Sequence, residues 1–358
     1  MTGALSLPQW SVGADAGAPP PAPESIHGHG TLRDAHGRTI RDLRISLTDR
    51  CNFRCVYCME PDVRFAEPST LLRADEFVRL GSVAASLGIR RIRLTGGEPT
   101  LHPDLGSIAR GLREATGCEL ALTTNGARGD AATVADWRRH GIDRVTVSLD
   151  TLDPDRFARL TRSRTPLADV LSCIEHCILE DLGPVKVNVV LLRDRNDDEA
   201  VAFAELARRL AIEVRFIEWM PLDSGRTWRS DHWVSASETR RRIEAAHPLV
   251  AEPTADPSAT ATTFRFADGE RGRVGFIAPI SSPFCGACSR LRLTADGKVR
   301  PCLFSDREWD LRPLLRGGGS DEDLRRFLVD AAWSKQAGHG IDAPDFVPPP
   351  RPMSAIGG

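Results

Sequence analysis

Two groups of three cysteines are the residues in this sequence best suited to chemistry. The stretch DRCNFRCVYC holds the first group, and the second has the spacing CxxC-x13-C. Structural zinc and ordinary iron–sulfur clusters usually take four protein ligands. Three thiolates can instead hold three corners of a [4Fe–4S] cube and leave the fourth iron open to a substrate or cofactor. The predicted metal ligands are Cys51, Cys55, Cys58, Cys285, Cys288 and Cys302.

Spacing alone does not identify the metal, so a zinc ion completed by a remote residue is the alternative at each group. Two such groups in one chain are more specific for clusters than either group alone. Cys118, Cys173 and Cys177 have no further ligands nearby in the sequence, and we interpret them as buried thiols.

Two further stretches have residue types that suit ligand binding. In TGGEPTL (residues 95–101), the glycines let the backbone approach a ligand closely, although an ordinary turn is the alternative. In SRLRL, Arg290 and Arg292 are two residues apart and would share one face of a strand. Two guanidinium groups on one face suit phosphate, and their position beside Cys288 favours a site over a solvated strand.

The elements that would position these residues alternate regularly from residue 41 onward. Apolar runs predict strands, and amphipathic stretches between them, such as residues 75–87, 167–182 and 197–210, predict helices. The expected fold class is α/β, a partial (β/α)6 TIM-like barrel with a parallel sheet and a C-terminal extension. In such folds the chemistry lies at the C-terminal ends of the strands, where the first cysteine group falls. The predicted strands are residues 43–47, 91–95, 119–123, 144–149, 185–192 and 213–218.

Composition divides the chain into three parts. Residues 1–35 are rich in Ala, Gly and Pro and predict a disordered N-terminal tail, with a Pro-rich partner-binding segment as the alternative. Residues 36–250 would form the barrel. Residues 251–358 begin with a linker-like stretch, continue through a hairpin around Asp296-Gly297 and a helix near 321–335, and end in Gly-Gly.

Bulk composition excludes some classes of function. The formal net charge of -2 over 358 residues argues against non-specific nucleic-acid binding, which needs a basic surplus. The sequence has no apolar run long enough to span a membrane and no secretory signal pattern. We therefore expect a cytoplasmic protein, in which disulfides are rare.

The first cysteine group resembles that of the radical S-adenosylmethionine enzymes, because CxxxCxxC follows the first predicted strand and Tyr57 precedes the third cysteine. In that family the methionine moiety of S-adenosylmethionine chelates the open iron. An electron cleaves the sulfonium, and the 5′-deoxyadenosyl radical abstracts a hydrogen atom. By this resemblance the cofactor contacts are Tyr57, Gly97, Ser148 and Met220.

The second cysteine group, the arginines after it and the terminal Gly-Gly narrow the resemblance to the GTP 3′,8-cyclases, over about residues 38–358. This resemblance implies a lyase with two [4Fe–4S] clusters and S-adenosylmethionine. The second cluster would bind the guanine of GTP. The radical would remove the ribose 3′ hydrogen, and the 3′ carbon would attack C8 of guanine. The product would be 3′,8-cyclo-7,8-dihydro-GTP, an intermediate of molybdenum cofactor biosynthesis.

The same resemblance implies roles for particular residues. Arg44, Gly357 and Gly358 would be catalytic, and the two glycines would enter the active site. The implied substrate contacts are Arg44, Arg93, Thr123, Lys186, Arg290, Leu291 and Arg292. Several of these cations lie on separate predicted strands and could converge on a barrel lumen. Buried cations are costly unless paired, and a triphosphate would pair them.

The resemblance also implies partners: the GTP substrate, a reducing electron donor, a cyclic pyranopterin monophosphate synthase that uses the product, and a second copy in a homodimer. Two other readings are open. Another radical enzyme with an accessory cluster, such as a peptide-modifying one, gives no reason for Arg290, Arg292 or the Gly-Gly end. A non-enzymatic zinc-binding adaptor leaves TGGEP unexplained.

Overall fold

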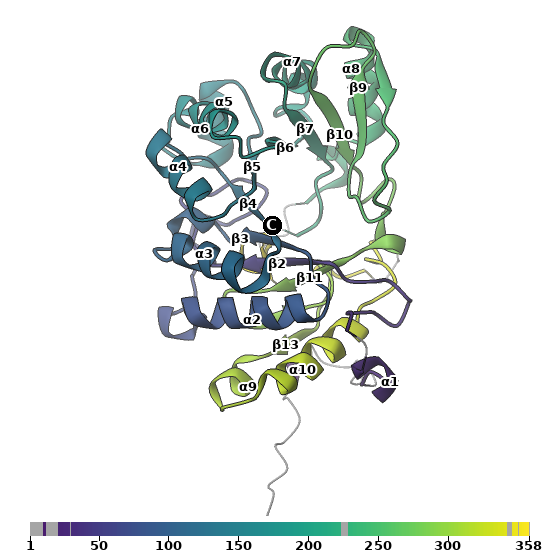
Figure 1. Ribbon diagram of the computed structural model, residues 1–358. Coiled ribbons are helices and arrows are strands. Elements are labelled where there is room, and N and C mark those ends of the chain that lie inside the picture. Colours follow the sequence, from purple (N-terminus) through teal and green to yellow (C-terminus); the bar gives the residue numbers. More distant parts are fainter. Residues whose placement is uncertain are drawn as a thin grey trace, which may run out of the picture.

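Six parallel strands form the centre of a single curved sheet (Figure 1). The computed structural model describes residues 10–11, 21–28, 30–222, 228–341, 346–349 and 351–357. The six strands lie side by side in chain order, and every neighbouring pair is parallel. They are β2 (Asp42–Ser46), β3 (Arg91–Thr95), β4 (Glu119–Thr124), β5 (Arg144–Ser148), β6 (Lys186–Val190) and β7 (Glu213–Ile217). The six predicted strands and the partial barrel are therefore confirmed.

Helices connect these strands and cover the outer face of the sheet (Figure 1). Aspartates begin two of them: Asp130 accepts the N–H of Thr133 at 2.8 Å, and Asp153 accepts the N–H of Arg156 at 2.6 Å. Such N-caps satisfy amide groups that have no partner within the helix. The helices are α2 (Ala74–Ser86), α3 (Leu105–Thr116), α4 (Ala131–Arg139), α5 (Pro154–Thr161), α6 (Leu167–Leu179) and α7 (Ala200–Leu210).

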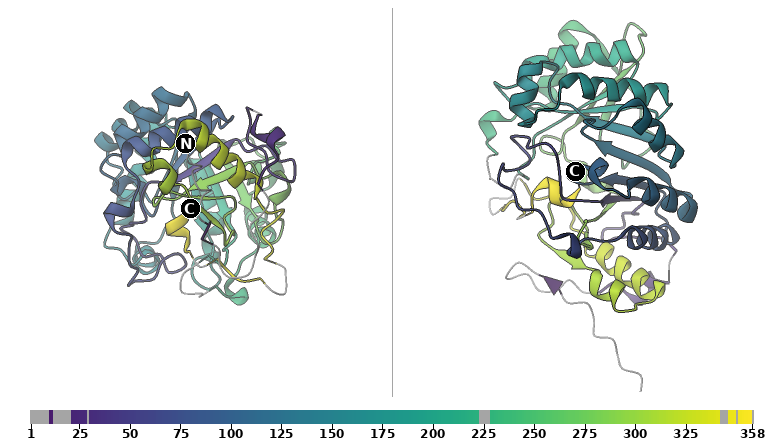
Figure 2. Two further views of the ribbon diagram at one scale, coloured as in Figure 1. Left: turned by 90° about the horizontal axis from the view of Figure 1, so that it is seen from below. Right: turned by 90° about the vertical axis from the view of Figure 1, so that its left-hand side faces the viewer.

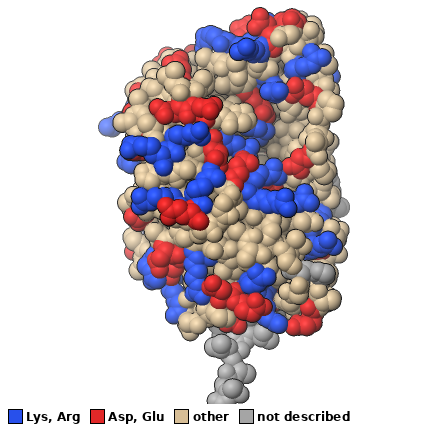
Figure 3. All heavy atoms as spheres, in the orientation of Figure 1, with Lys and Arg blue, Asp and Glu red and all other residues tan. Residues whose placement is uncertain are grey.

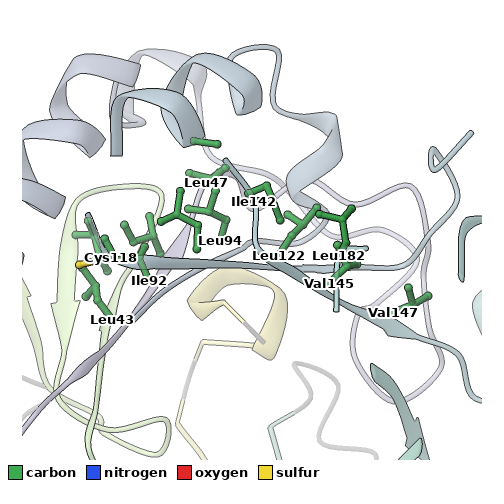
Figure 4. Close-up of a cluster of buried hydrophobic side chains, with 14 of the residues drawn as sticks. Leu43, Leu47, Ile92, Leu94, Cys118, Leu122, Ile142, Val145, Val147 and Leu182 are labelled. Carbon is green, nitrogen blue, oxygen red and sulfur yellow. The ribbon is translucent and has the colours of Figure 1, made fainter. Parts of the chain in front are cut away.

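The main hydrophobic core lies between the sheet and these helices (Figure 4). Its strand residues are almost all Leu, Ile or Val, the composition typical of parallel sheets that are covered by helices. Fully buried members include Ile92, Leu94, Leu122, Val145, Val147 and Leu182. The apolar half of each strand thus faces the helices, which leaves the other half to line the inner, concave side.

The C-terminal region adds one parallel strand to each end of this sheet. β10 (Arg273–Ile277) pairs with β7, and β11 (Arg290–Leu293) pairs with β2. Eight consecutive strands are therefore parallel. Among the described residues they belong to a 13-stranded sheet whose two ends do not pair with each other. The sequence did not predict this, because neither strand follows the helix-crossover pattern that identifies a parallel neighbour.

The remaining elements flank this core. The predicted hairpin forms between β11 and β12, with Gly297 at a φ of 75° in the turn. The other strands are β1 (Trp10–Ser11), β8 (Leu249–Ala251), β9 (Thr262–Phe266), β12 (Lys298–Arg300) and β13 (Glu308–Asp310). The other α-helices are α1 (Glu24–His27), α8 (Ala236–Ala246), α9 (Arg312–Arg316), α10 (Asp321–Trp333) and α11 (Met353–Ile356). The 3₁₀ helices are η1 (Pro68–Thr70), η2 (Pro99–Leu101), η3 (Asp197–Glu199), η4 (Ser230–His232) and η5 (Cys285–Ala287).

No helix among the described residues is long and apolar enough to cross a membrane. Lys, Arg, Asp and Glu are interspersed on the face shown in Figure 3.

The N-terminal segment differs from the expectation of a disordered tail through residue 35. Residues 1–9 and 12–20 lie outside the described residues, but the segment from residue 30 joins the fold. Leu32 is fully buried, and its N–H donates to the Leu87 carbonyl at 2.8 Å. Composition alone assigned this segment to the tail, because one buried leucine among polar residues gives no periodic signal.

Substitution of Leu32 by alanine tests this boundary. Leu32→Ala should lower the free energy of unfolding by about 2–5 kcal/mol, because it opens a cavity in the core. Leu179→Ala is the control, since Leu179 is 80% exposed, and it should leave the free energy nearly unchanged. Equal stability of both variants in chemical denaturation would place Leu32 outside the cooperative core.

Candidate functional site

The first cysteine group lies on a loop that is tied to the end of helix α5. The N–H groups of Arg54 and Val56 donate to the carbonyls of Thr161 and Leu160, at 2.8 and 3.0 Å. These carbonyls end α5, where the helix itself supplies no donor. The loop backbone is thus held by protein hydrogen bonds on both sides of Cys55.

The TGGEP turn after β3 holds the same loop from its other side. The N–H of Gly97 donates to the Thr48 carbonyl, and that of Glu98 donates to the Arg50 carbonyl, both at 2.7 Å. A Cβ at Gly97 would lie 2.6 Å from the Asp49 carbonyl oxygen and closer still to that of Arg50. Glycine is therefore required here because the cysteine loop packs directly against this turn.

Glu98 connects this turn to the first cysteine. Its buried carboxylate accepts hydrogen bonds from the hydroxyl of Thr124 and the N–H of Asn125, each at 2.7 Å. Burial raises the pKa of Glu98, and these hydrogen bonds oppose that rise. The Asn125 amide in turn donates to Asn52 at 2.8 Å and contacts the Cys51 sulfur at 3.9 Å.

Tyr57, the single tyrosine of the chain, belongs to the loop of the first cysteine group. Its hydroxyl donates to Asp150 at 2.7 Å, and the other carboxylate oxygen of Asp150 accepts the Val190 N–H at 2.8 Å. Burial raises the pKa of Asp150 to about 6. The ring packs against a small apolar cluster that includes Trp219. Tyr57 thus fixes the loop to the ends of β5 and β6.

The thiols of the first group lie close together. Burial raises the pKa of Cys55 well above its usual value, and Asp150, Cys58 and Cys51 add to this effect. Burial also raises the pKa of Cys51 to about 11. These thiols would ionise readily only with a positive partner, and bound iron is such a partner. Their grouping on one preformed loop fits a cluster.

The second cysteine group is built by two segments of the chain. Cys285 lies in η5, Cys288 precedes β11, and Cys302 follows β12. The buried guanidinium of Arg38 donates to the carbonyls of Cys285 and Ala337, at 2.7 and 2.9 Å. Arg38 therefore holds the first segment against the chain that follows α10.

Positive charge surrounds this second group. Burial opposes ionisation of Cys288, but Lys335 and Arg290 outweigh it and lower its pKa to about 7. Lys335 is buried, and its ammonium group donates to the Arg290 carbonyl at 2.8 Å and to the Pro301 carbonyl. The pKa of Cys285 is raised by burial and also by Cys302 and Cys288, so these three thiols too lie together.

Neither group is arranged for a single metal ion. Among the described residues, no three His, Cys, Asp or Glu side chains converge closely enough to hold one. Zinc would need all of its ligands within about 2.3 Å of one point. The same finding applies to iron, so this geometry leaves zinc and an iron–sulfur cluster as alternatives at both groups.

A cavity of about 370 Å³ lies on the concave side of the sheet, beside the second cysteine group. All eight parallel strands contribute residues to its wall. Nine cationic side chains line it, against two carboxylates, Asp42 and Asp256. The cations are Arg44, Arg91, Arg93, Arg144, Lys186, Arg215, Arg290, Arg292 and Lys335.

Four of these nine cations have carboxylate partners. Arg91 pairs with Asp42 and Asp256, and Lys186 pairs with Glu213 at 2.9 Å. The other two pairs are Arg215 with Glu213 and Arg144 with Glu119. For the remaining five, the described chain supplies no carboxylate within ion-pair distance. The cavity therefore carries an excess of positive charge that a polyanion would compensate.

Strand register brings three of the unpaired arginines together. Arg292 of β11 is opposite Arg44 of β2, which is opposite Arg93 of β3. Burial, and then Arg290, lower the pKa of Arg44 to about 10. Burial and the charge of Arg44 also lower the pKa values of Arg93 and Arg292. These shifts report like charges held close together away from water.

The other predicted site residues fall in different places. Thr123 and Met220 also line the cavity, and Thr123 accepts a hydrogen bond from Arg93 at 3.0 Å. Ser148 ends β5 and is half-buried. Leu291 lies in the hydrophobic core with its side chain fully buried, so only its backbone can face a ligand. Gly358 lies outside the described residues.

The last described residues of the chain lie inside the molecule. In the right-hand view of Figure 2, helix α11 lies beside the inner side of the curved sheet. Ile356 is fully buried, and the Gly357 carbonyl accepts a hydrogen bond from Arg292. A Cβ at Gly357 would lie 2.5 Å from the Thr95 hydroxyl oxygen. Gly357 thus approaches the cavity where only a glycine fits.

Sequence reasoning missed several residues of the cavity. Arg215 and Arg144 lie on predicted strands, and their alternation with buried apolar residues was a usable signal. Asp256 and Ser258 gave no such signal, because they belong to the linker-like stretch after β8. That stretch turns back over the cavity, where Asp256 pairs with Arg91 at 2.9 Å.

Comparison with known families assigns two regions of the chain. Residues 45–207 match the model of the Radical SAM superfamily, and residues 212–341 match that of Molybdenum Cofactor Synthesis C. Two relatives cover almost the whole chain. It is 45% identical to GTP 3′,8-cyclase of Streptomyces coelicolor, over 93% of this chain and 98% of the relative. It is 42% identical to GTP 3′,8-cyclase of Corynebacterium glutamicum, over 99% of this chain and 96% of the relative.

Solved structures support the fold. SuiB of Streptococcus suis, bound to its precursor peptide SuiA, superposes with a TM-score of 0.59 at 14% identity, covering 85% of this chain and 67% of that one. Native anSMEcpe with bound AdoMet superposes with a TM-score of 0.56 at 15% identity, covering 83% and 81%. At this level of identity the likeness concerns the fold alone.

Substitution of Gly97 tests the packing of the first loop. Gly97→Ala would push the loop away from the turn, and after anaerobic reconstitution we expect cleavage of S-adenosylmethionine to fall about a hundredfold, the cost of a misplacement of roughly 1 Å. Iron content should also fall. Gly30→Ala is the matched control, because a Cβ at Gly30 meets no atom within 4 Å and Gly30 belongs to neither cysteine group. Wild-type iron and cleavage in Gly97→Ala would show that the close approach is not needed.

Proposed function

The chain belongs to the GTP 3′,8-cyclase family of radical S-adenosylmethionine enzymes, and we propose that its cavity binds GTP between two iron–sulfur clusters. Membership of this family implies an iron–sulfur cluster and S-adenosylmethionine. The observation that carries the proposal is the cavity itself, in which nine cations and two carboxylates adjoin the second cysteine group.

The triphosphate would occupy the region of unpaired positive charge. Arg44, Arg93 and Arg292 lie side by side on three neighbouring strands, and guanidinium groups suit bidentate contacts with phosphate. Each would then face an opposite charge, which would offset the repulsion from its like-charged neighbours. The same residues would therefore provide most of the binding energy and orient the nucleotide.

The guanine would lie at the second cysteine group. Cys285, Cys288 and Cys302 line the cavity together with Phe284, whose ring lies 5.0 Å from the Arg290 guanidinium. Three thiolates would hold a second [4Fe–4S] cluster with one iron open to the base. The ribose would then lie farther along the cavity, towards Met220 and Met353.

The first cysteine group would hold the cluster that, when bound, supplies the electron for cleavage of S-adenosylmethionine to the 5′-deoxyadenosyl radical. This chain's own residues orient the reactants: Tyr57 and Glu98 fix the loop, and Gly97, Ser148 and Met220 would contact the cofactor. Loss of the ribose 3′ hydrogen lets C3′ bond to C8 of guanine. One electron and one proton then complete 3′,8-cyclo-7,8-dihydro-GTP.

Gly357 and Gly358 would act beside this site, with Arg44. A reducing electron donor must supply one electron for cleavage of S-adenosylmethionine and one electron to complete the product. A cyclic pyranopterin monophosphate synthase would use that product. We also propose a homodimer in the cytoplasm, which follows from the family resemblance and not from any contact described above. The division near residue 250 is likewise a proposal.

Reconstitution with iron and sulfide under anaerobic conditions tests the proposal directly. With dithionite, S-adenosylmethionine and GTP, we expect about eight irons per chain, 5′-deoxyadenosine and a cyclised GTP product. Cys302→Ala should lose about half of the iron and all of the GTP product. Cys173→Ala is the control, since that buried thiol lies outside both groups. Two clusters that leave GTP unchanged would refute the substrate, and bound zinc would refute the chemistry.

The pH dependence of GTP binding offers a second test. Burial, and then Arg215, lower the pKa of Lys186 to about 8, although Glu213 opposes this shift. The ammonium form is therefore lost as the pH rises through about 8. Above that pH, GTP should bind about tenfold more weakly, because one charged hydrogen bond contributes about that much to affinity. Lys186→Arg keeps its charge and should bind GTP equally well across this range. An equally steep dependence in that variant would exclude Lys186 as the cause.

A further inference from the structure

An ion-pair cluster lies at the start of the C-terminal segment that reaches the cavity. The guanidinium of Arg351 donates two hydrogen bonds to the carboxylate of Asp296, at 3.0 and 2.6 Å. Its Nε lies 2.8 Å from a carboxylate oxygen of Glu308. Asp296 belongs to the turn between β11 and β12, and Glu308 begins β13. One side chain thus joins the segment to two parts of the sheet.

These ion pairs are largely shielded from solvent. Arg351 is about one-quarter exposed, Asp296 less than one-fifth and Glu308 nearly buried. Although burial opposes ionisation of Asp296, Arg351 lowers its pKa to about 2, so the carboxylate is charged at any working pH. A bidentate arginine–carboxylate pair also fixes direction, which a single point charge cannot do.

The rest of the segment is held at its middle and its end. The Met353 N–H donates to the Leu222 carbonyl at 3.1 Å, and Ile356 is fully buried. At the far end, the Gly357 carbonyl accepts from Arg292, a residue of the cavity wall. Among the described residues of this segment, Arg351 alone bears a charge, and it lies six positions before Gly357.

We propose that Arg351 is a positioning residue, whose bidentate pair with Asp296 anchors the C-terminal segment so that Gly357 is presented to the cavity. It contacts neither cysteine group and does not line the cavity. It acts by raising the local concentration of the terminal glycines at the site. This inference rests on the proposed function, because it concerns the use of the terminal glycines in GTP turnover.

The test compares full-length, reconstituted variants of Arg351. Arg351→Met keeps the apolar stem and removes the charge, and we expect GTP-dependent formation of 5′-deoxyadenosine to fall about tenfold while iron content and GTP affinity stay near wild type. Arg351→Lys, which cannot form the bidentate pair, should be intermediate. Arg326→Met, which breaks an exposed ion pair with Glu24, is the control and should be unaffected.

Two further measurements separate anchoring from general damage. Hydrogen exchange at the Met353 amide should be faster in Arg351→Met than in the wild type, since its hydrogen bond to the Leu222 carbonyl forms only while the segment is docked. The free peptide RPMSAIGG, added at high concentration to Arg351→Met, should restore part of the lost turnover. A variant damaged elsewhere would show neither effect.

Several outcomes would overturn the proposal. Wild-type turnover and wild-type exchange in Arg351→Met would do so. If that variant does not fold, Asp296→Asn must show the same loss of turnover and the same faster exchange, and a normal Asp296→Asn protein would refute the anchor. Failure of the proposed function is distinct, because then the wild-type protein itself would not convert GTP.

Discussion

Repulsion among cations gathered in one lumen is the constraint that the rest of this structure must satisfy. Nine Lys and Arg side chains line the cavity, and five of them have no carboxylate partner in the described chain. Such an arrangement is unfavourable without a ligand, because buried charge is poorly solvated. Hydrogen bonds from Arg93, Arg292 and Lys335 to neutral groups hold part of this set, and the scaffold must supply the rest through interactions that do not involve the charged groups.

Those interactions lie on the opposite face of the same strands. Ile92, Leu94 and Val145 are fully buried against the helices, while Arg93 and Arg144 alternate with them and face the lumen. Backbone pairing between parallel strands fixes the register, so that Arg292, Arg44 and Arg93 are adjacent. Hydrophobic packing on the outer face of the sheet thus stabilises strands whose inner face carries charges that repel one another. A bound triphosphate would offset that repulsion.

The two cysteine groups are attached to this frame by ordinary protein contacts. Carbonyls at the end of α5 and the glycine turn after β3 hold the first loop, and Arg38 holds the second group against the chain after α10. The two groups lie at opposite ends of strands that carry the cations, because Cys51 follows β2 whereas Cys288 precedes its parallel neighbour β11. Under the proposed function, phosphate would bind in the cavity beside the second group.

The sequence by itself determined the six central strands, the helices between them and both cysteine groups, because periodicity and cysteine spacing are local signals. It also identified Arg44, Arg93, Lys186, Arg290 and Arg292, through the resemblance to a known family. Only the tertiary structure decided that β10 and β11 extend the parallel sheet, that the stretch around Asp256 turns back over the cavity, and that Arg351 pairs with Asp296. These contacts join residues far apart in the chain, and their geometry depends on how the whole sheet curves, which no local pattern records.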